Sequence, residues 1–195
     1  MSAGRGHLVA IGASWGGLDT LRTILQRLPA GLDAAIVVAQ HRAPESHRTA
    51  FRDLLGAVTH LNVREADDKD DLQPGTVYIA APDYHLLVEG STLALSTEGP
   101  VAYARPSIDV MFETAAESYR EGCIGVVLTG ANDDGALGLA RVLEYGGVAI
   151  VQDPETATRN EMPKAALAAV PNARVAGPEG IAEAIVELCG LRAVA

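Results

Sequence analysis

The chain has 195 residues, enough for one domain with a sizeable hydrophobic core. Hydrophobic residues make up 48% and aromatic residues only 4%, so Ala, Val, Leu and Ile are expected to fill that core. The formal net charge of −10 argues against a nucleic acid or an anionic membrane as a general partner. We find no signal peptide and no apolar run of about 18 residues, which predicts a cytoplasmic protein with no membrane insertion.

The first predicted elements are a strand and a helix joined by a tight, glycine-rich turn. The apolar run that starts at Val9 ends at Gly12, and Gly16 and Gly17 lead into the helical spacing of LDTLRTILQRL. Gly12 to Gly16 fit the G-x-S-x-G elbow, which exposes a serine, here Ser14, beside the free N–H groups of the helix. The same kind of turn also binds phosphate in nucleotide-binding folds, so this motif alone leaves both functions open.

The next segments predict further strands of a buried sheet. AAIVVAQ, residues 34–40, is continuously apolar, as expected for a strand covered on both faces, and His41 follows it directly. A helix is expected after it, with Ser46 as its N-cap, and then strands at THLNVREA and VYIAA. HLLVEG and STLALS predict a hairpin appended to the parallel sheet.

The second half of the chain alternates helices and strands to its end. SIDVMFETAAESYREG predicts a helix capped by Ser107, CIGVVLTG a buried strand, and ALGLARVLEYGG a helix after Asn132-Asp133-Asp134-Gly135. VAIVQD, EMPKAALAAV, RVAG and EGIAEAIVELCGL continue the alternation. The fold class predicted is α/β, a doubly wound and mostly parallel sheet with helices on both faces and a small antiparallel hairpin. We expect residues 1–195 to form a single domain with its core at about residues 8–188.

Three polar segments follow predicted parallel strands and should therefore meet at one edge of the sheet. Ser14 follows the first strand, His41 the second, and Asp133 and Asp134 the CIGVVLTG strand. A neutral imidazole can accept the proton of a serine hydroxyl, and a buried carboxylate can orient the imidazole. The sequence thus indicates a serine hydrolase in which either aspartate is the acid. The default alternative is that this Asn-Asp-Asp-Gly segment only caps the next helix.

His7 and His60 precede strands, which places them at the opposite edge and excludes them from the site. Cys123 and Cys189 are far apart and lie in apolar segments, so we expect buried thiols. The cysteines and histidines have no metal-ligand spacing, and we expect no metal and no cofactor.

Taken together, these motifs resemble the catalytic domain of the CheB family of chemotaxis protein-glutamate methylesterases, from about Leu8 to Leu188. The resemblance is carried by IGASWGG, VVAQHRAP, ADDKDDLQPGTVYIAAPDYHLLV, RPSIDVMFETAAE, VVLTGANDDGALGL and VQDPETATRNEMPKAAL. It implies hydrolysis of glutamate methyl esters on chemoreceptor signalling helices, with release of methanol, and deamidation of receptor glutamines as a further activity. The implied partner is a methylated chemoreceptor or a related signalling protein. Because we expect no receiver domain, the alternatives for regulation are a constitutive enzyme, control by a separate regulatory protein, or a fragment of a longer product.

Carried over residue by residue, the resemblance makes Ser14 the nucleophile, His41 the base and Asp134 the triad acid. Asp133 is then expected to cap or shape its loop. Backbone N–H groups near Trp15 and at Gly130 and Ala131 are the expected oxyanion hole. His85 and Arg105 match recurrent residues of the family on the same edge, and we expect supporting roles for both.

The chain departs from the family's usual pattern in three respects. Trp15 stands where a small hydroxyl residue is common. It is expected to cover the pocket, alter substrate choice or lower the rate, and the alternative is that it packs in the ordinary way. Asn132 replaces a usual glycine and should preserve the loop by tolerating left-handed backbone angles. The first strand begins within ten residues of Met1, so we expect no receiver domain ahead of the catalytic domain.

Two other functions compete with the esterase. A non-catalytic interaction module would use the same edge to bind a signalling protein. Nucleotide binding at the first turn is disfavoured, because the chain has neither a Walker lysine nor a clean G-x-G-x-x-G pattern.

Overall fold

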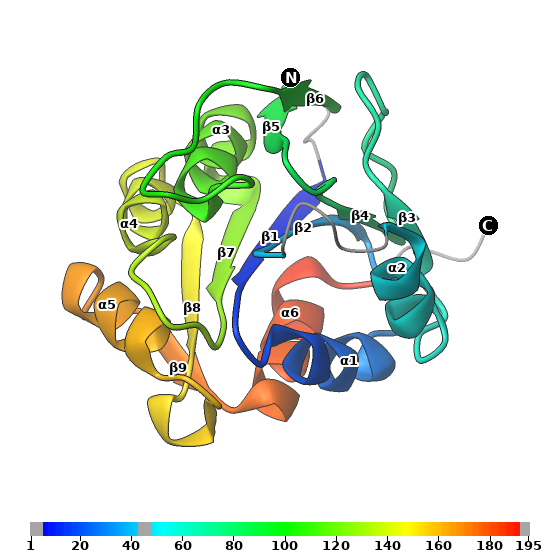
Figure 1. The fold of residues 1–195 in the computed structure, drawn as a ribbon. Helices are drawn as coiled ribbons and strands as arrows, with labels where there is room; N and C mark the ends of the chain where they lie inside the picture. The colour runs from blue at the N-terminus through cyan, green and yellow to red at the C-terminus, as the bar shows by residue number, and fades with distance from the viewer. Residues whose placement is uncertain (1–5, 43–47, 192–195) are drawn as a thin grey trace.

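A computed structural model describes residues 6–42 and 48–191, and its central feature is a seven-stranded parallel sheet (Figure 1). Its strands, in chain order, are β1 (His7–Ala13), β2 (Ala34–Gln40), β3 (Asn62–Glu65), β4 (Thr76–Ile79), β7 (Cys123–Val127), β8 (Val148–Gln152) and β9 (Arg174–Ala176). Their spatial order is β3-β4-β2-β1-β7-β8-β9, and every pairing is parallel. The predicted doubly wound sheet is confirmed.

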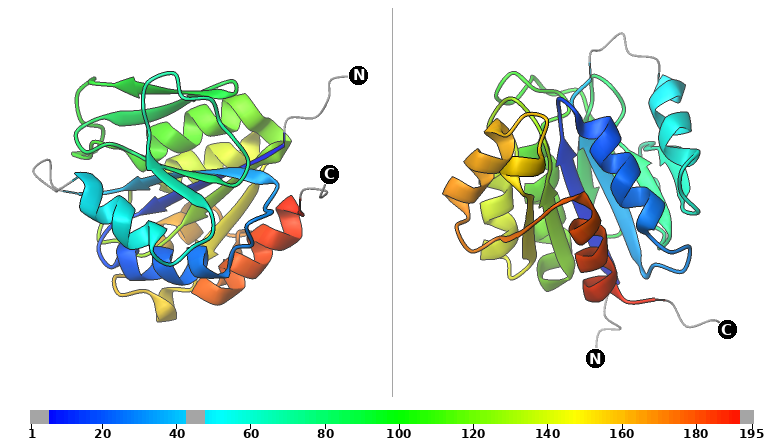
Figure 2. Two further views of the ribbon diagram at one scale, coloured as in Figure 1. Left: turned by 90° about the vertical axis from the view of Figure 1, so that its right-hand side faces the viewer. Right: turned by 90° about the horizontal axis from the view of Figure 1, so that it is seen from below.

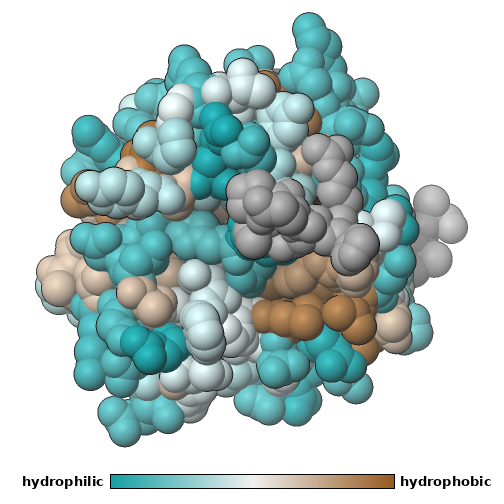
Figure 3. All heavy atoms as spheres, viewed as in Figure 1, coloured by the Kyte–Doolittle hydropathy of each residue, from teal (hydrophilic) through white to brown (hydrophobic). Residues whose placement is uncertain are grey.

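Helices cover both faces of the sheet, as expected (Figures 1 and 2). They are α1 (Gly17–Arg27), α2 (Arg48–Gly56), α3 (Ile108–Tyr119), α4 (Ala136–Glu144), α5 (Glu161–Ala169) and α6 (Pro178–Cys189), with short 3-10 turns η1 (Arg120–Gly122) and η2 (Pro154–Thr156). Leu8 and Ala10 of β1 pack on the side of α3, α4 and α5, whereas Val9 and Ile11 pack on the side of α1, α2 and α6. The two buried clusters consist mainly of aliphatic side chains, as the low aromatic content predicts. The outer surface seen in Figure 3 is mainly hydrophilic, with a compact apolar area at the lower right.

The predicted hairpin is present, but it is not part of the parallel sheet. Strands β5 (His85–Glu89) and β6 (Thr92–Ser96) pair only with each other as a separate antiparallel sheet. Alternate hydrophobic residues of the hairpin, Leu86 and Val88, pack against α3 in one of the buried clusters. Backbone hydrogen bonds from residues 69–72 occupy part of the outer edge of β6. These contacts attach the hairpin to α3 rather than to an edge strand, so the expectation that it is appended to the parallel sheet was wrong.

The strand order places a switch point beside β1. The chain proceeds from β1 to β2, then to β3 at the edge and back to β4 between them, all on one side of β1, and then crosses to β7 on the other side. In such sheets the carboxyl ends of the strands next to the switch point form the ligand-binding crevice. Ser14, His41 and the loop that begins at Leu128 all follow strands at this edge, as predicted, and His7 and His60 lie at the beginnings of strands.

Cys123 and Cys189 are buried free thiols, as predicted, and burial raises the pKa of each to about 12. Neither is therefore an activated thiolate at neutral pH. Within residues 6–42 and 48–191, no cluster of His, Cys, Asp and Glu side chains could hold a metal ion. In the same part of the chain, no helix has the length and apolar character needed to cross a membrane.

Candidate active site

The serine elbow has the strand-turn-helix geometry that its glycine pattern predicts. Strand β1 ends at Ala13 and α1 begins at Gly17, whose N–H donates to the carbonyl of Ser14 at 2.9 Å. Gly16 has a φ of 81°, a left-handed conformation that favours glycine. A Cβ atom there would also lie 2.6 Å from the Cβ of Thr158. Ser14 therefore stands at the end of a strand on a turn that is sharp because residue 16 is glycine.

Hydrogen bonds connect the ends of β1, β2 and β7 around Ser14. The N–H of Ser14 donates to the carbonyl of Thr129, which follows β7, at 2.9 Å. The Gln40 amide at the end of β2 donates to the carbonyls of both Ser14 and His41, at 2.7 and 3.1 Å. Sequence reasoning missed Gln40, although it is the one polar residue in an otherwise apolar strand. It couples the turn that carries the serine to the residue that carries the imidazole.

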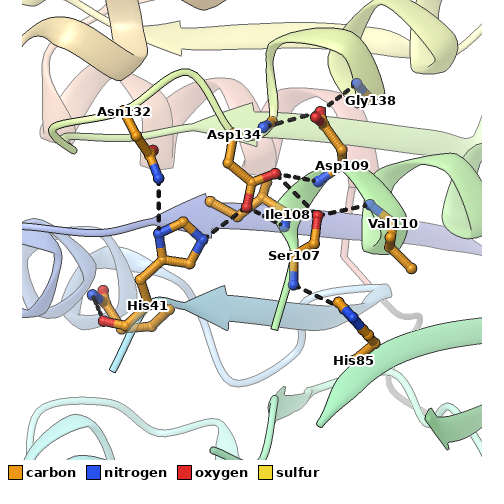
Figure 4. Close-up of polar contacts among 11 residues, drawn as sticks. His41, His85, Ser107, Ile108, Asp109, Val110, Asn132, Asp134 and Gly138 are labelled. Carbon is orange, nitrogen blue, oxygen red and sulfur yellow. Dashed lines mark hydrogen bonds and ion pairs between the residues drawn. The ribbon is translucent and has the colours of Figure 1, made fainter. Parts of the chain in front are cut away.

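The imidazole of His41 lies against a buried carboxylate. Its Nε2 lies 2.8 Å from Oδ2 of Asp134, which is almost completely buried (Figure 4). The other ring nitrogen, Nδ1, faces the side-chain amide of Asn132 at 3.5 Å. An ionised carboxylate only accepts, so Nε2 carries the proton and Nδ1 is left as the basic nitrogen. No hydrogen bond joins the Ser14 hydroxyl to His41 in this structure.

Asp134 is held at the N-terminus of α3 by three further donors. The hydroxyl of Ser107 and the N–H groups of Ile108 and Asp109 donate to its two oxygens at 3.1, 2.8 and 3.0 Å (Figure 4). Burial alone would raise the pKa of Asp134, but the hydrogen bonds from His41, Ile108 and Asp109 outweigh it and the pKa is lowered. Asp134 is therefore an ionised carboxylate at neutral pH, stabilised by the positive end of a helix.

The helix that follows Asp134 is not capped by the aspartates that precede it. The N-cap of α4 is Gly135, in a left-handed conformation, and no side chain of its own caps the helix. The acceptor is Asp109 of α3, which receives the N–H groups of Gly135 and Gly138 at 2.9 and 2.6 Å. The alternative in which this segment only caps the next helix was wrong, because Asp134 instead accepts N–H groups of α3.

Asn132 plays a different role from the one expected of it. The left-handed non-glycine residues of the described chain are Lys69, Asp83, Ala102, Tyr103 and Arg120, so the left-handed backbone expected at Asn132 is not observed. Its side chain instead extends the site, because its amide nitrogen faces Nδ1 of His41. The amide oxygen is buried and has no hydrogen-bond partner among the described residues.

His85 and Arg105 support the walls of the site. Nδ1 of buried His85 accepts from the Ser107 N–H at 3.1 Å, and Nε2 donates to the carbonyl of Gly99 at 3.1 Å. Arg105 donates to Asp83 at 2.9 Å and to the carbonyls of residues 97 and 98. His85 therefore holds the start of α3, and Arg105 braces the segment before it.

The backbone hydrogen bonds reduce the number of candidate donors for the expected oxyanion hole. The Gly130 N–H donates to the carbonyl of Arg159 at 3.0 Å, so the expectation that it is a free donor was wrong. Gly130 still touches the serine, because a Cβ added to it would lie 2.9 Å from the Cβ of Ser14. Among the described residues, none accepts a hydrogen bond from the N–H of Trp15 or of Ala131, and these two groups stay as candidates. The Trp15 side chain is 69% exposed, which contradicts the alternative of ordinary packing.

A cavity of about 440 Å³ opens beside His41. It is lined by His41, Arg42, Asp83, Pro100, Ala102, Tyr103, Ala104, Arg105 and Asn132. A larger cavity, of about 610 Å³, lies between α1 and α6 and is lined by Arg27, Ala182, Glu183, Val186 and Glu187. It has no histidine on its wall, whereas the smaller cavity is lined by His41.

The fold and the site define an α/β enzyme whose reactive groups lie at the switch point of a doubly wound sheet. The family model of the CheB methylesterase matches residues 9–185, and the chain belongs to this family. It is 44% identical over 181 residues to a homologue from Leptospira interrogans, which covers 92% of the chain and 93% of the homologue.

Longer relatives share the same region. A protein-glutamate methylesterase/protein-glutamine glutaminase of Anaeromyxobacter dehalogenans is 40% identical over 169 residues, which is 85% of the chain and 48% of that protein. The crystal structure of the Thermotoga maritima CheB methylesterase catalytic domain superimposes with a TM-score of 0.89 at 35% identity, and covers 94% of the chain and 98% of that domain. The chain thus matches a catalytic domain almost completely and spans about half of the Anaeromyxobacter protein.

Proposed function

We propose that this protein hydrolyses glutamate methyl esters on the signalling helices of chemoreceptors, with Ser14, His41 and Asp134 as its catalytic triad. The observation that carries the proposal is the 2.8 Å contact between His41 Nε2 and buried Asp134, at the sheet edge where Ser14 follows β1. Membership of the CheB methylesterase family supports both the ester chemistry and the receptor as substrate.

The geometry of the His41 ring determines how the proton would move. Asp134 holds Nε2, so Nδ1 takes the proton of the Ser14 hydroxyl as its oxygen attacks the ester carbonyl. The proton then goes from Nδ1 to the methoxide, and methanol leaves an acyl-enzyme on Ser14. Water, deprotonated by Nδ1, hydrolyses this acyl-enzyme and restores both the glutamate and the serine. The N–H groups of Trp15 and Ala131 would stabilise the oxyanion. Ser14 and His41 are not hydrogen-bonded in this structure, and the proposed mechanism requires this contact in the complex with substrate.

The same cycle extends to glutamine side chains. Attack on a primary amide gives the same acyl-enzyme, with ammonia instead of methanol as the leaving group, and the names of relatives include protein-glutamine glutaminase. We propose deamidation as a second activity of the same triad. Loss of the Ser14 hydroxyl should abolish both reactions together.

The test is methanol release from receptor membranes that carry methylated glutamates, measured for the native protein and for Ser14→Ala. The expected result is release by the native protein and none by the variant, with the same circular dichroism spectrum for both. Equal release by both proteins would contradict the triad.

A serine-directed phosphonate tests the alternative of a non-catalytic interaction module. An active triad gives one adduct, at Ser14. A folded native protein that neither labels nor releases methanol would favour the module.

Receptor binding is proposed to depend on positive charge near the cavity. The chain is acidic overall, whereas Arg42 and Arg105 line the cavity; the side chain of Arg48, a third candidate, lies outside the described residues. Reversal of the charges at Arg42 and Arg105 should weaken receptor binding and reduce its salt dependence. Unchanged salt dependence would contradict this role.

A further inference from the structure

The segment between β6 and α3 carries a tyrosine that no part of the described chain covers. Val101 and Ala104 exchange both backbone hydrogen bonds, at 3.1 and 2.9 Å, so Ala102 and Tyr103 form a two-residue turn. The exposure of Tyr103 is 104%, as for an isolated residue. The turn therefore presents an aromatic ring to solvent, although burying a large aromatic side chain would favour folding.

The backbone of this turn is also unfavourable for the residues that form it. Ala102 and Tyr103 have φ values of 48° and 64°, both left-handed. Two-residue turns of this kind favour Asn-Gly or Gly-Gly, because side chains with a Cβ are strained there. Neither the ring nor the backbone of Tyr103 therefore has an evident role in stability.

The turn is fixed beside the reacting groups. Arg105 binds the carbonyls of residues 97 and 98 on one side of it, and His85 binds the carbonyl of Gly99. Ala102, Tyr103 and Ala104 line the same cavity as His41 and Asn132. Tyr103 thus lines this cavity in a segment that His85 and Arg105 fix at residues 97–99, and these are the two residues for which the resemblance implied supporting roles.

From this arrangement we propose that Tyr103 is a specificity-determining residue, which packs against the protein segment on either side of the glutamyl ester. The inference rests on the proposed function and adds which residue of this chain recognises the receptor segment around the ester. A small ester that binds beside His41 in the cavity of about 440 Å³ would leave most of the fully exposed Tyr103 ring in solvent. A helix that inserts one side chain must instead cover the rim, where the ring lies. Trp15, exposed next to Ser14, provides a second aromatic group at this edge.

The test compares Tyr103→Ala and Tyr103→Gly with the native protein and with Val175→Ala, a matched control. Val175 is exposed on β9, at the far edge of the sheet. For methanol release from methylated receptor membranes, both Tyr103 variants should raise KM about tenfold, which corresponds to about 1.4 kcal/mol of binding free energy. The value of kcat and the rate of phosphonate labelling at Ser14 should not change. Val175→Ala should match the native protein in every measurement.

Thermal unfolding separates binding from folding. Glycine adopts the φ of 64° without strain, so Tyr103→Gly should unfold at a temperature no lower than Tyr103→Ala, while both lose receptor affinity equally. An unchanged KM in both variants would overturn the inference, and so would slower phosphonate labelling, because the turn would then only position His41. Phosphonate labelling of the native protein without methanol release would instead overturn the proposed receptor substrate, and this inference with it.

Discussion

Asp109 and Asp134 cap each other's helices. Asp134, in the loop before α4, accepts the N–H groups of Ile108 and Asp109 at the start of α3, and Asp109 accepts those of Gly135 and Gly138 at the start of α4. Each carboxylate thus satisfies backbone donors that a helix leaves unpaired. The arrangement fixes the carboxylate that holds His41 by means of two helices, not by its own loop alone.

Replacement of Asp109 by alanine should therefore lower both stability and activity. Two N–H groups of α4 lose their acceptor, which should lower the free energy of unfolding by about 1–2 kcal/mol. Urea denaturation measures this change. Burial raises the pKa of Asp109, so its charge is partly unfavourable and Asp109→Asn, which keeps an acceptor oxygen, should lose less. A fall in kcat for Asp109→Ala should accompany the loss of stability, because the loop that carries Asp134 is loosened. Equal stability of the alanine variant and the native protein would contradict the capping role.

Stability should fall in acid because of Asp134. Its pKa is lowered in the folded protein, whereas an unfolded aspartate protonates at about pH 3.9. As the pH falls below about 5, the unfolded state therefore takes up more protons, and the stabilisation by Asp134 is lost down to its folded pKa.

The measurement is the unfolding free energy of the native protein and of Asp134→Asn between pH 3 and 7. The difference between the two should be largest at neutral pH and should shrink as the solution becomes acidic. Asp133→Asn is the matched control, because the neighbouring carboxylate makes no hydrogen bond to a described residue. A difference for Asp134→Asn that does not change with pH would show that the carboxylate is not specifically stabilised.

Gln40 should contribute to catalysis only by positioning Ser14 and His41. Gln40→Met keeps a similar volume but removes the N–H groups that bind the carbonyls of Ser14 and His41. The expected loss is about 1–2 kcal/mol in unfolding free energy, because two carbonyls lose a donor, together with a lower kcat and an unchanged KM. Steady-state methanol release checks this, and a rise in KM with an unaltered kcat would assign Gln40 to substrate binding instead.

Much of the fold could be predicted because it depends on local patterns. Apolar runs such as residues 34–40 end at polar residues, and parallel strands place those ends at one edge. This predicted that Ser14, His41 and one of Asp133 or Asp134 lie together, and the family resemblance chose Asp134. The hairpin could not be placed, because its attachment to α3 depends on which surfaces are left uncovered after the sheet has formed.

The parts of the site that sequence reasoning missed depend on contacts between distant segments. Asp109 caps a helix that begins 25 residues or more further along the chain, and no local motif records such a pairing. The Gly130 N–H was expected to be free, and only the position of residue 159 shows that it is occupied. For Asn132 the sequence predicted only that its backbone tolerates left-handed angles. Its side chain in fact faces the imidazole of His41, which follows another strand.

Gly130→Ala should separate the stability of the β7 loop from its catalytic role. The new Cβ would lie 1.8 Å from the sulfur of Met162 and 2.9 Å from the Cβ of Ser14. Met162 is long and flexible, so Gly130→Ala combined with Met162→Ala should remove the first clash and recover part of the unfolding temperature that Gly130→Ala loses. The second clash involves the short side chain of Ser14 on a fixed turn, so methanol release should stay low in the double variant. Met162→Ala alone measures the cost of the cavity that it leaves. Recovery of activity together with stability would show that the contact between Gly130 and Ser14 does not position the nucleophile.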